Sequence, residues 1–286
     1  MQAGCAIIGS MDTLSIISAL GTVVALACAA GGATGALGEP RDVTFKAQVD
    51  GSEQRYVEML PVGFGPDEQH DVLIALHGCG ADRWQYVRDA RDECRAARDI
   101  AAKRAMIFIS PDYRAPGSWM GPKAEADVLQ IIRELRRKYK VGRVFLVGAS
   151  MGGASVLTFA ALHPELIAGV SSLNGTANYL LYDGFQEYIV ASFGGTREQI
   201  PAEYKKRSAE YWPEKFTMPL AITTGGKDTI VPPDSAVRLA EAVRRNGGRV
   251  LLINRPEVGH CTTYEDSMTA LEWVIGCTLN GKQPAV

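Results

Sequence analysis

The chain has 286 residues, 47% of them hydrophobic, so it is long enough to bury a large core in one main domain. Its net charge of −2 excludes the strongly basic surface of a nucleic-acid-binding protein, and we expect no nucleic acid among its partners. Basic residues do cluster at 133–138 and 205–207, but the first cluster shares a predicted helix with an apolar face, which favours a solvated surface.

The first 38 residues differ from the rest because Asp12 is their only charged side chain. They contain an apolar run at 14–30, typical of a secretory signal, with 25–27 as a cleavage site. A lipidated Cys28, a short membrane anchor and a wrongly assigned start codon are the alternatives. We therefore expect a leader over 1–38, a secreted or periplasmic protein, and membrane contact only through an uncleaved or lipidated N-terminus.

The remaining chain, 39–286, has the pattern of a single α/β domain. Two segments that alternate apolar and polar residues predict opening antiparallel strands at 43–49 and 55–62. Strands and helices then alternate, which predicts a mostly parallel central sheet with helices on both faces. Strands are expected at 72–76, 106–110, 144–148, 168–173, 218–225 and 249–254, and helices at 84–103, 124–139 and from 151 to 162. Residues 174–219 break the alternation and are expected to form a small lid.

The most informative stretch runs from an apolar strand through Gly148-Ala-Ser150-Met-Gly152 into a helix, which is the layout of a nucleophile elbow. Such a tight turn strains its central residue, and only residues without bulk fit on either side. Ser150 is therefore the predicted nucleophile. A simple turn serine would explain neither the strand nor the helix.

An elbow of this kind needs an acid and then a histidine further along the chain. Asp228 follows a strand that ends at a glycine pair, and His260 lies in the loop after the next strand. Parallel-sheet enzymes place their chemistry beyond the carboxyl ends of strands, so these residues complete a predicted triad with Ser150. Asp234 ranks second as the acid, because its place at the start of a predicted helix explains it without a catalytic role. The other histidines lie before a strand, in a glycine-rich loop and at a helix end (His70, His77 and His163).

Four motifs, each after a predicted strand, carry a resemblance to a known superfamily. They are His77-Gly-Cys-Gly80, Gly148-Ala-Ser-Met-Gly152, Gly225-Gly-Lys-Asp-Thr-Ile-Val-Pro232 and Gly259-His260. Over residues 43–277 the chain resembles α/β-hydrolase serine esterases, related to the catalytic domain of prolyl oligopeptidases and to polyhydroxybutyrate depolymerases and feruloyl esterases. The resemblance implies the α/β-hydrolase fold and leaves the substrate open.

The predicted chemistry follows from the residue types. His260 accepts the proton of Ser150 during attack, and Asp228 orients the imidazole. Backbone N–H groups of Met151 and Cys79 are expected to stabilise the oxyanion, with Gly80 as the alternative to Cys79. We expect neither a cofactor nor a metal, because no Cys or His pair has ligand spacing.

The substrate pocket and the cysteines are less determined. Trp119, Tyr179 and Tyr182 are candidate pocket residues, and ordinary packing explains each of them equally well. Four cysteines follow the leader (Cys79, Cys94, Cys261 and Cys277), which allows three pairings. A bridge between Cys79 and Cys261 would clamp the site, whereas free thiols acting as small apolar residues are the alternative.

The sequence thus predicts a serine carboxylesterase whose partner is an ester substrate, either a small molecule, a polysaccharide-linked ester or a polyester. The alternatives are a serine peptidase of the prolyl-oligopeptidase type and a noncatalytic binding protein on the same fold.

Overall fold

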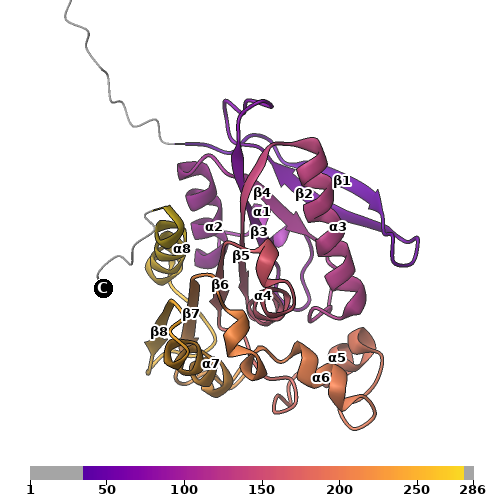
Figure 1. Cartoon of the computed structure of the whole chain (residues 1–286), viewed down its shortest axis with the longest axis vertical. Helices are drawn as coiled ribbons and strands as arrows, with labels where there is room; N and C mark the ends of the chain where they lie inside the picture. The colour runs from indigo at the N-terminus through magenta and orange to yellow at the C-terminus, as the bar shows by residue number, and fades with distance from the viewer. Residues whose placement is uncertain (1–34, 280–286) are drawn as a thin grey trace, which may run out of the picture. The chain divides into compact units, whose positions relative to one another are not determined.

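The computed structural model describes residues 35–279, and Figure 1 shows a central sheet with helices packed on both of its sides. The predicted leader lies almost wholly outside the described residues. No helix within 35–279 has the length and apolar character needed to cross a membrane.

The strands form one sheet in the order β1-β2-β4-β3-β5-β6-β7-β8. The strand β1 pairs antiparallel with β2, β2 pairs antiparallel with β4, and the remaining pairs are parallel. The strands are β1 (Arg41–Lys46), β2 (Glu53–Met59), β3 (His70–Leu76), β4 (Ile107–Pro111), β5 (Val141–Ala149), β6 (Gly169–Leu173), β7 (Leu220–Gly225) and β8 (Val250–Arg255). This confirms the predicted mostly parallel α/β sheet.

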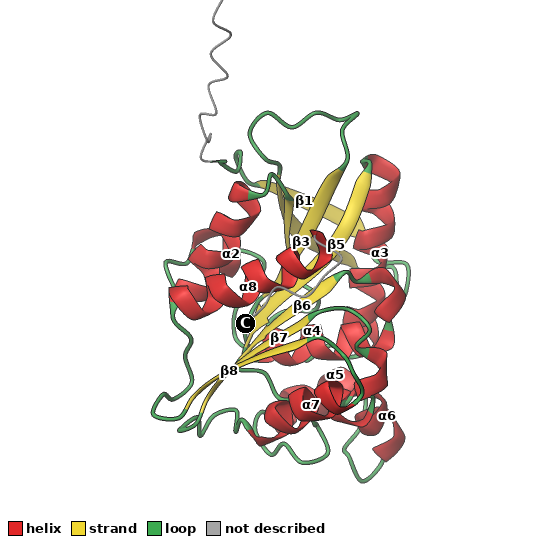
Figure 2. Ribbon diagram, turned by 60° about the vertical axis from the view of Figure 1, so that its left-hand side comes forward, coloured by secondary structure: helices red, strands yellow, loops and turns green. Residues whose placement is uncertain are grey.

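Helices cover both faces of the sheet. The helices are α1 (Gln85–Arg88), α2 (Asp92–Lys103), α3 (Pro122–Lys138), α4 (Met151–Leu162), α5 (Gln186–Phe193), α6 (Pro201–Arg207), α7 (Asp234–Arg245) and α8 (Tyr264–Leu279). One face packs against α3, α4 and α7, and the other against α1, α2 and α8 (Figure 2).

The central strands are apolar on both sides because both faces are covered. In β3, Ile74 and Leu76 belong to the core under α3 and α4, whereas Leu73 and Ala75 belong to the core under α2 and α8. Successive side chains of a strand point to opposite faces, so a buried parallel strand reads as a continuous apolar run. This pattern made these strands visible in the sequence.

The predicted helix at 84–103 is two helices, α1 and α2, with a break after Arg88. The Asp89 backbone is extended, with φ −69° and ψ 138°, and its Oδ1 accepts the N–H of Arg91 at 2.9 Å. An Asp side chain that bonds a nearby backbone N–H competes with the helical hydrogen bond. The break turns the start of α2 towards the carboxyl ends of the strands.

The segment 174–219 folds onto the body of the domain. Rings of Tyr179, Phe193 and Tyr204 stack edge to face, with centroids 5.2 and 5.0 Å apart, in the same core as α4. The Arg207 side chain is 1% exposed and donates to the backbone oxygen of Met120 and to Glu125, at 2.6 and 2.8 Å. The segment is thus anchored by a buried cation and an aromatic cluster.

The Glu125–Arg207 pair predicts a specific acid sensitivity. Burial alone would raise the pKa of Glu125, but the hydrogen bond with His163 and the charge of Arg207 outweigh it and hold the pKa at about 2 instead of 4.5. Because the folded pKa lies below the unfolded one, the ionised group stabilises the fold above pH 4.5 and loses this effect as the pH falls towards 2. Glu125→Gln should lower the free energy of unfolding at neutral pH and flatten its acid decline, measured by urea titration. The exposed Glu165→Gln is the control, and an unchanged acid decline in Glu125→Gln would contradict this role.

Candidate active site

Ser150 occupies the turn between β5 and α4 in a strained backbone conformation, with φ 57° and ψ −120°. A non-glycine residue there is destabilised by about 1–3 kcal/mol and needs support from its surroundings. The backbone N–H of Ser150 donates to the Leu173 oxygen at 2.8 Å, and this hydrogen bond connects the turn to the end of β6. A Cβ on Gly148 would overlap the backbone of Gly152, and one on Gly152 would overlap the carbonyl oxygen of Leu76. The elbow therefore accepts only glycine at both flanking positions.

Asp228 and His260 form an acid–imidazole pair whose carboxylate is buried. The Asp228 side chain is 1% exposed, and its Oδ2 lies 2.6 Å from Nδ1 of His260. Its Oδ1 accepts the backbone N–H groups of Ile230 and Val231, both at 2.9 Å. A carboxylate held in this way assigns the imidazole proton to Nδ1 and leaves Nε2 as the base.

Ser150 and His260 line one cavity of about 400 Å³ beyond the carboxyl ends of the strands. The structure therefore places the predicted nucleophile and base in one cavity and hydrogen-bonds the base to the predicted acid. The other lining residues come from the loop after β3, from α1 and the start of α2, from the ends of β5 and β6, and from the loop after β8: Gly78, Gln85, Ala90, Arg91, Asp92, Glu93, Ala149, Asn174, Cys261 and Thr262.

The structure distinguishes the two candidates for the oxyanion-binding N–H from the loop after β3. The N–H of Gly80 donates to the Pro116 oxygen at 2.9 Å and is therefore occupied. Within residues 35–279, the N–H groups of Cys79 and Met151 have no acceptor. Cys79 rather than Gly80 thus remains available beside Met151 as an oxyanion donor.

His77 holds the loop after β3 in place. Its fully buried ring lies with Nδ1 at 2.8 Å from the Gly78 oxygen and Nε2 at 3.0 Å from the Asp112 oxygen. Burial lowers the pKa of His77 below its ordinary value of 6.5, so the ring is neutral and donates to one of these carbonyls. Tyr113 donates its hydroxyl to the His77 oxygen at 2.6 Å. His77 therefore supports the loop after β3 and does not line the cavity.

The predicted pocket residues do not line the cavity with Ser150, which corrects that prediction. Trp119 and Tyr179 are fully buried, and Tyr182 is 5% exposed. The Trp119 ring packs on Tyr179 and Tyr182, with centroids 6.2 and 5.5 Å apart. Large rings gain most from packing against one another in a core, and here that packing leaves Trp119 and Tyr179 no surface for a substrate.

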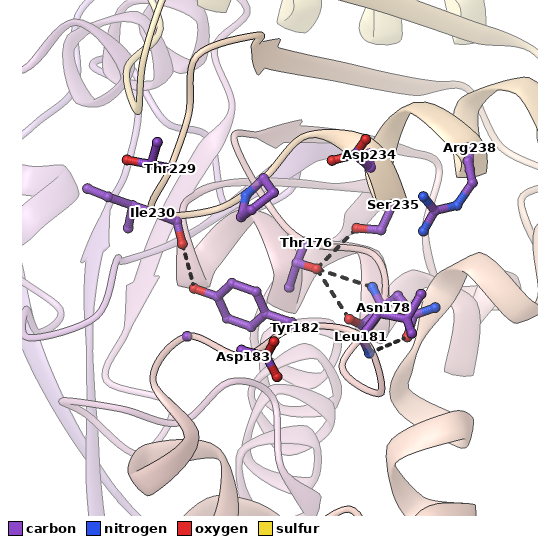
Figure 3. A pocket seen from close by; sticks show the side chains of 12 residues that line it. Thr176, Asn178, Leu181, Tyr182, Asp183, Thr229, Ile230, Asp234, Ser235 and Arg238 are labelled. Atoms are coloured by element: carbon purple, nitrogen blue, oxygen red, sulfur yellow. Dashed lines mark hydrogen bonds between the residues drawn. The ribbon is translucent and has the colours of Figure 1, made fainter.

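Tyr182 instead borders a separate cavity of about 320 Å³ (Figure 3). Its hydroxyl donates to the Ile230 oxygen at 3.1 Å, and on the other side Thr176 and Ser235 exchange a hydrogen bond of 3.1 Å. Asp234 lies here, at the start of α7 and outside the lining of the cavity that contains His260. Asp228, and not Asp234, contacts Nδ1 of His260, so Asp234 is not the acid partner of this imidazole.

The cysteines of the described residues are free, so the hypothetical Cys79–Cys261 bridge is absent. Cys79 packs against the core on the α4 side, whereas Cys261 is exposed and lines the cavity. Burial raises the pKa of the Cys79 thiol, which keeps it protonated. Across residues 35–279, no three Asp, Glu, His or Cys side chains gather as metal ligands would.

Several cavity residues escaped the sequence analysis. Asn174 directly follows β6, has a left-handed backbone with φ 51°, and is 5% exposed with its Nδ2 unpaired within the described chain. Its place after a strand end is the signal that could have found it. Gln85 begins α1, Arg91 lies in the break before α2, and Glu93 lies in the first turn of α2. No sequence pattern indicated this break.

Comparison with known proteins places the chain in a family. The model of the prolyl oligopeptidase family matches residues 119–274, more than half of the chain, and this stretch contains all three triad candidates. The chain belongs to the prolyl oligopeptidase family. It is thus a member of a serine hydrolase family with the α/β-hydrolase fold. No curated protein sequence matches it.

Solved structures show the same fold in this family member's neighbours. FphF, a fluorophosphonate-binding serine hydrolase of Staphylococcus aureus, is 16% identical with a TM-score of 0.63, covering 85% of this chain and 99% of that one. The ferulic acid esterase of Anaeromyces mucronatus is 17% identical with a TM-score of 0.60, covering 85% and 93%. The acylaminoacyl peptidase of Pyrococcus horikoshii is 16% identical with a TM-score of 0.65, covering 88% and 43%. The chain spans 35–43% of the length of the peptidases that it matches.

Replacing the buried acid tests the proposed triad. In Asp228→Asn the amide donates to Nδ1 and forces the imidazole proton onto Nε2, so kcat should fall about 10⁴-fold with little change in stability. Steady-state kinetics on a p-nitrophenyl ester and a thermal melt measure both effects. Asp234→Asn is the matched control, and equal losses in the two variants would argue against Asp228 as the acid.

Proposed function

We propose that this serine hydrolase is a carboxylesterase that works through an acyl-enzyme on Ser150. The observation that carries the proposal is the 2.6 Å contact between Asp228 and His260, which share one reaction centre with a strained Ser150. A binding protein on the same fold would have no need to keep a buried acid–base pair beside a strained serine.

The proposed reaction has two halves. Ser150 Oγ attacks the ester carbonyl while Nε2 of His260 takes its proton, and the charge on the carbonyl oxygen is held by the N–H groups of Met151 and Cys79. The intermediate collapses as His260 returns the proton to the leaving alcohol. Water then enters, gives one proton to His260 and its oxygen to the acyl carbon, and Ser150 recovers the proton as the acid leaves.

Two neighbours of the same fold support an ester substrate as the first candidate. They are FphF, which is a serine hydrolase, and the ferulic acid esterase, at 16% and 17% identity. We therefore propose that the substrate is an ester. It is either a small molecule, an ester linked to a polysaccharide or a polyester, and we do not choose among these three.

A serine peptidase is the second candidate, favoured by the match to the prolyl oligopeptidase model. The carboxylates of Asp92 and Glu93 also line the cavity, where they would attract a substrate amine. Asp92 is paired with Arg95 at 3.1 Å, and Arg91 lies 3.8 Å from Glu93, so this acidic wall is partly neutralised.

The apolar run at 14–30 motivates a further part of the proposal, that the protein acts outside the cytoplasm. Sequencing the N-terminus of the protein recovered from the producing cells tests it, because cleavage near residue 27 is expected. An intact N-terminus in a cytoplasmic fraction would contradict export.

Two assays test the enzymatic proposal. A fluorophosphonate probe should label the wild type and Ser155→Ala, a buried serine one turn further along α4, but not Ser150→Ala. The wild type should hydrolyse p-nitrophenyl acetate and butyrate and leave dipeptide p-nitroanilides intact, with Ser150→Ala reducing kcat about 10⁶-fold. Comparable kcat/KM values on the anilides would favour the peptidase, and labelling of Ser150→Ala would overturn the nucleophile.

A further inference from the structure

Gln85 places its carboxamide beside the reaction centre, although it belongs to none of the sequence motifs. Its Oε1 accepts the backbone N–H of Gly78 at 2.7 Å. A Cβ built on Gly78 would lie 3.8 Å from this oxygen and 3.9 Å from the Cβ of Ser150. The Gln85 carboxamide, Gly78 and the nucleophile are therefore immediate neighbours.

Gly78 lies between two peptide planes that separate contacts orient, and without a Cβ its backbone has more conformations open to it than another residue would have. On one side, the oxygen of the peptide that joins Gly78 to Cys79 lies 2.8 Å from Nδ1 of His77, and a ring with its proton on Nδ1 would donate to it. On the other side lies the peptide that joins His77 to Gly78. Its N–H belongs to Gly78 and has Gln85 as its only acceptor within residues 35–279. Gln85 and His77 together restrain both planes.

The direction of the Cys79 N–H depends on these two planes. Downstream the loop is fixed again, where Gly80 donates to the Pro116 oxygen at 2.9 Å. Without an acceptor at Gln85, this part-buried N–H would lose its only acceptor within residues 35–279, and rotation about Gly78 would let it find another. That rotation would turn the Cys79 N–H away from the position of the oxyanion.

We propose that Gln85 is a positioning residue for the oxyanion hole: its carboxamide holds Gly78 so that the Cys79 N–H points at the developing negative charge. The proposal rests on the proposed acyl-enzyme mechanism. Oxyanion donors act on the transition state, so the loss of Gln85 should appear in kcat and leave KM nearly unchanged.

Two substitutions separate positioning from general packing. Gln85→Leu keeps the size and removes the acceptor, so kcat for p-nitrophenyl acetate should fall about 10- to 100-fold, with KM within about threefold. Gln199→Leu is the matched control, because Gln199 Oε1 accepts the Thr196 N–H at 3.0 Å in an exposed turn, and it should keep the wild-type kcat. Thermal melts of both report folding.

Gln85→Glu keeps the acceptor and so remains informative if Gln85→Leu folds poorly. An ionised Glu holds the Gly78 N–H but adds negative charge beside the oxyanion, whereas a protonated Glu mimics the neutral amide. The ratio of its kcat to that of the wild type should therefore rise from pH 8 to pH 5, while the ratio for Gln85→Leu stays flat. Normalising to the wild type removes the titration of the charged groups that line the two adjacent cavities (Asp82, Arg88, Asp89, Arg91, Asp92, Glu93 and His260).

The outcomes are distinct. A raised KM with unchanged kcat would make Gln85 a substrate-binding residue and overturn the positioning role, as would a flat ratio for Gln85→Glu. If the wild type hydrolyses no ester, the second-order rate of fluorophosphonate labelling replaces kcat, because phosphonylation of Ser150 uses the same oxyanion donors. A failure of the esterase proposal is then distinguishable from a failure of the role of Gln85.

Discussion

The close crossing of β5, α4 and the end of β3 is the constraint on which the rest of the site depends. The carbonyl oxygen of Leu76 approaches Gly152 so closely that no side chain fits between them. This contact bends the chain sharply at Ser150 and keeps its backbone at φ 57°. It also brings the loop after β3 beside the nucleophile. One packing contact therefore positions both the hydroxyl of the proposed nucleophile and the loop that carries one of the proposed oxyanion donors.

The two sides of the reaction centre are held by different means. On the acid–base side, a carboxylate that is 1% exposed uses both oxygens, one for His260 and one for two backbone N–H groups. On the oxyanion side, the loop from His77 to Gly80 is restrained mainly by hydrogen bonds to its backbone. Charge holds the base and backbone geometry holds the donors, so a substitution on one side need not disturb the other.

The composition of the segment between β6 and β7 suggests that its aromatic residues bind substrate, but in the fold most of them pack in the core. Its aromatic residues build a core with Trp119, and Arg207 ties it to α3 through Glu125. Of this segment only Asn174 reaches the lining of the cavity with Ser150. One wall of this cavity comes instead from α1, the break after it and the start of α2, where charged and amide side chains outnumber apolar ones.

The sequence by itself determined the sheet and the triad candidates, because both depend on local patterns. Apolar runs mark strands buried on two faces, and Ser150, Asp228 and His260 each follow such a strand in the order that the fold requires. Only the tertiary structure decided which backbone N–H groups remain free and which aromatic rings are buried. The N–H of Gly80 donates to the Pro116 oxygen, Trp119 packs against Tyr182, and Gln85 accepts the N–H of Gly78. Each of these outcomes depends on which atoms of separate loops meet, and no single segment carries that information.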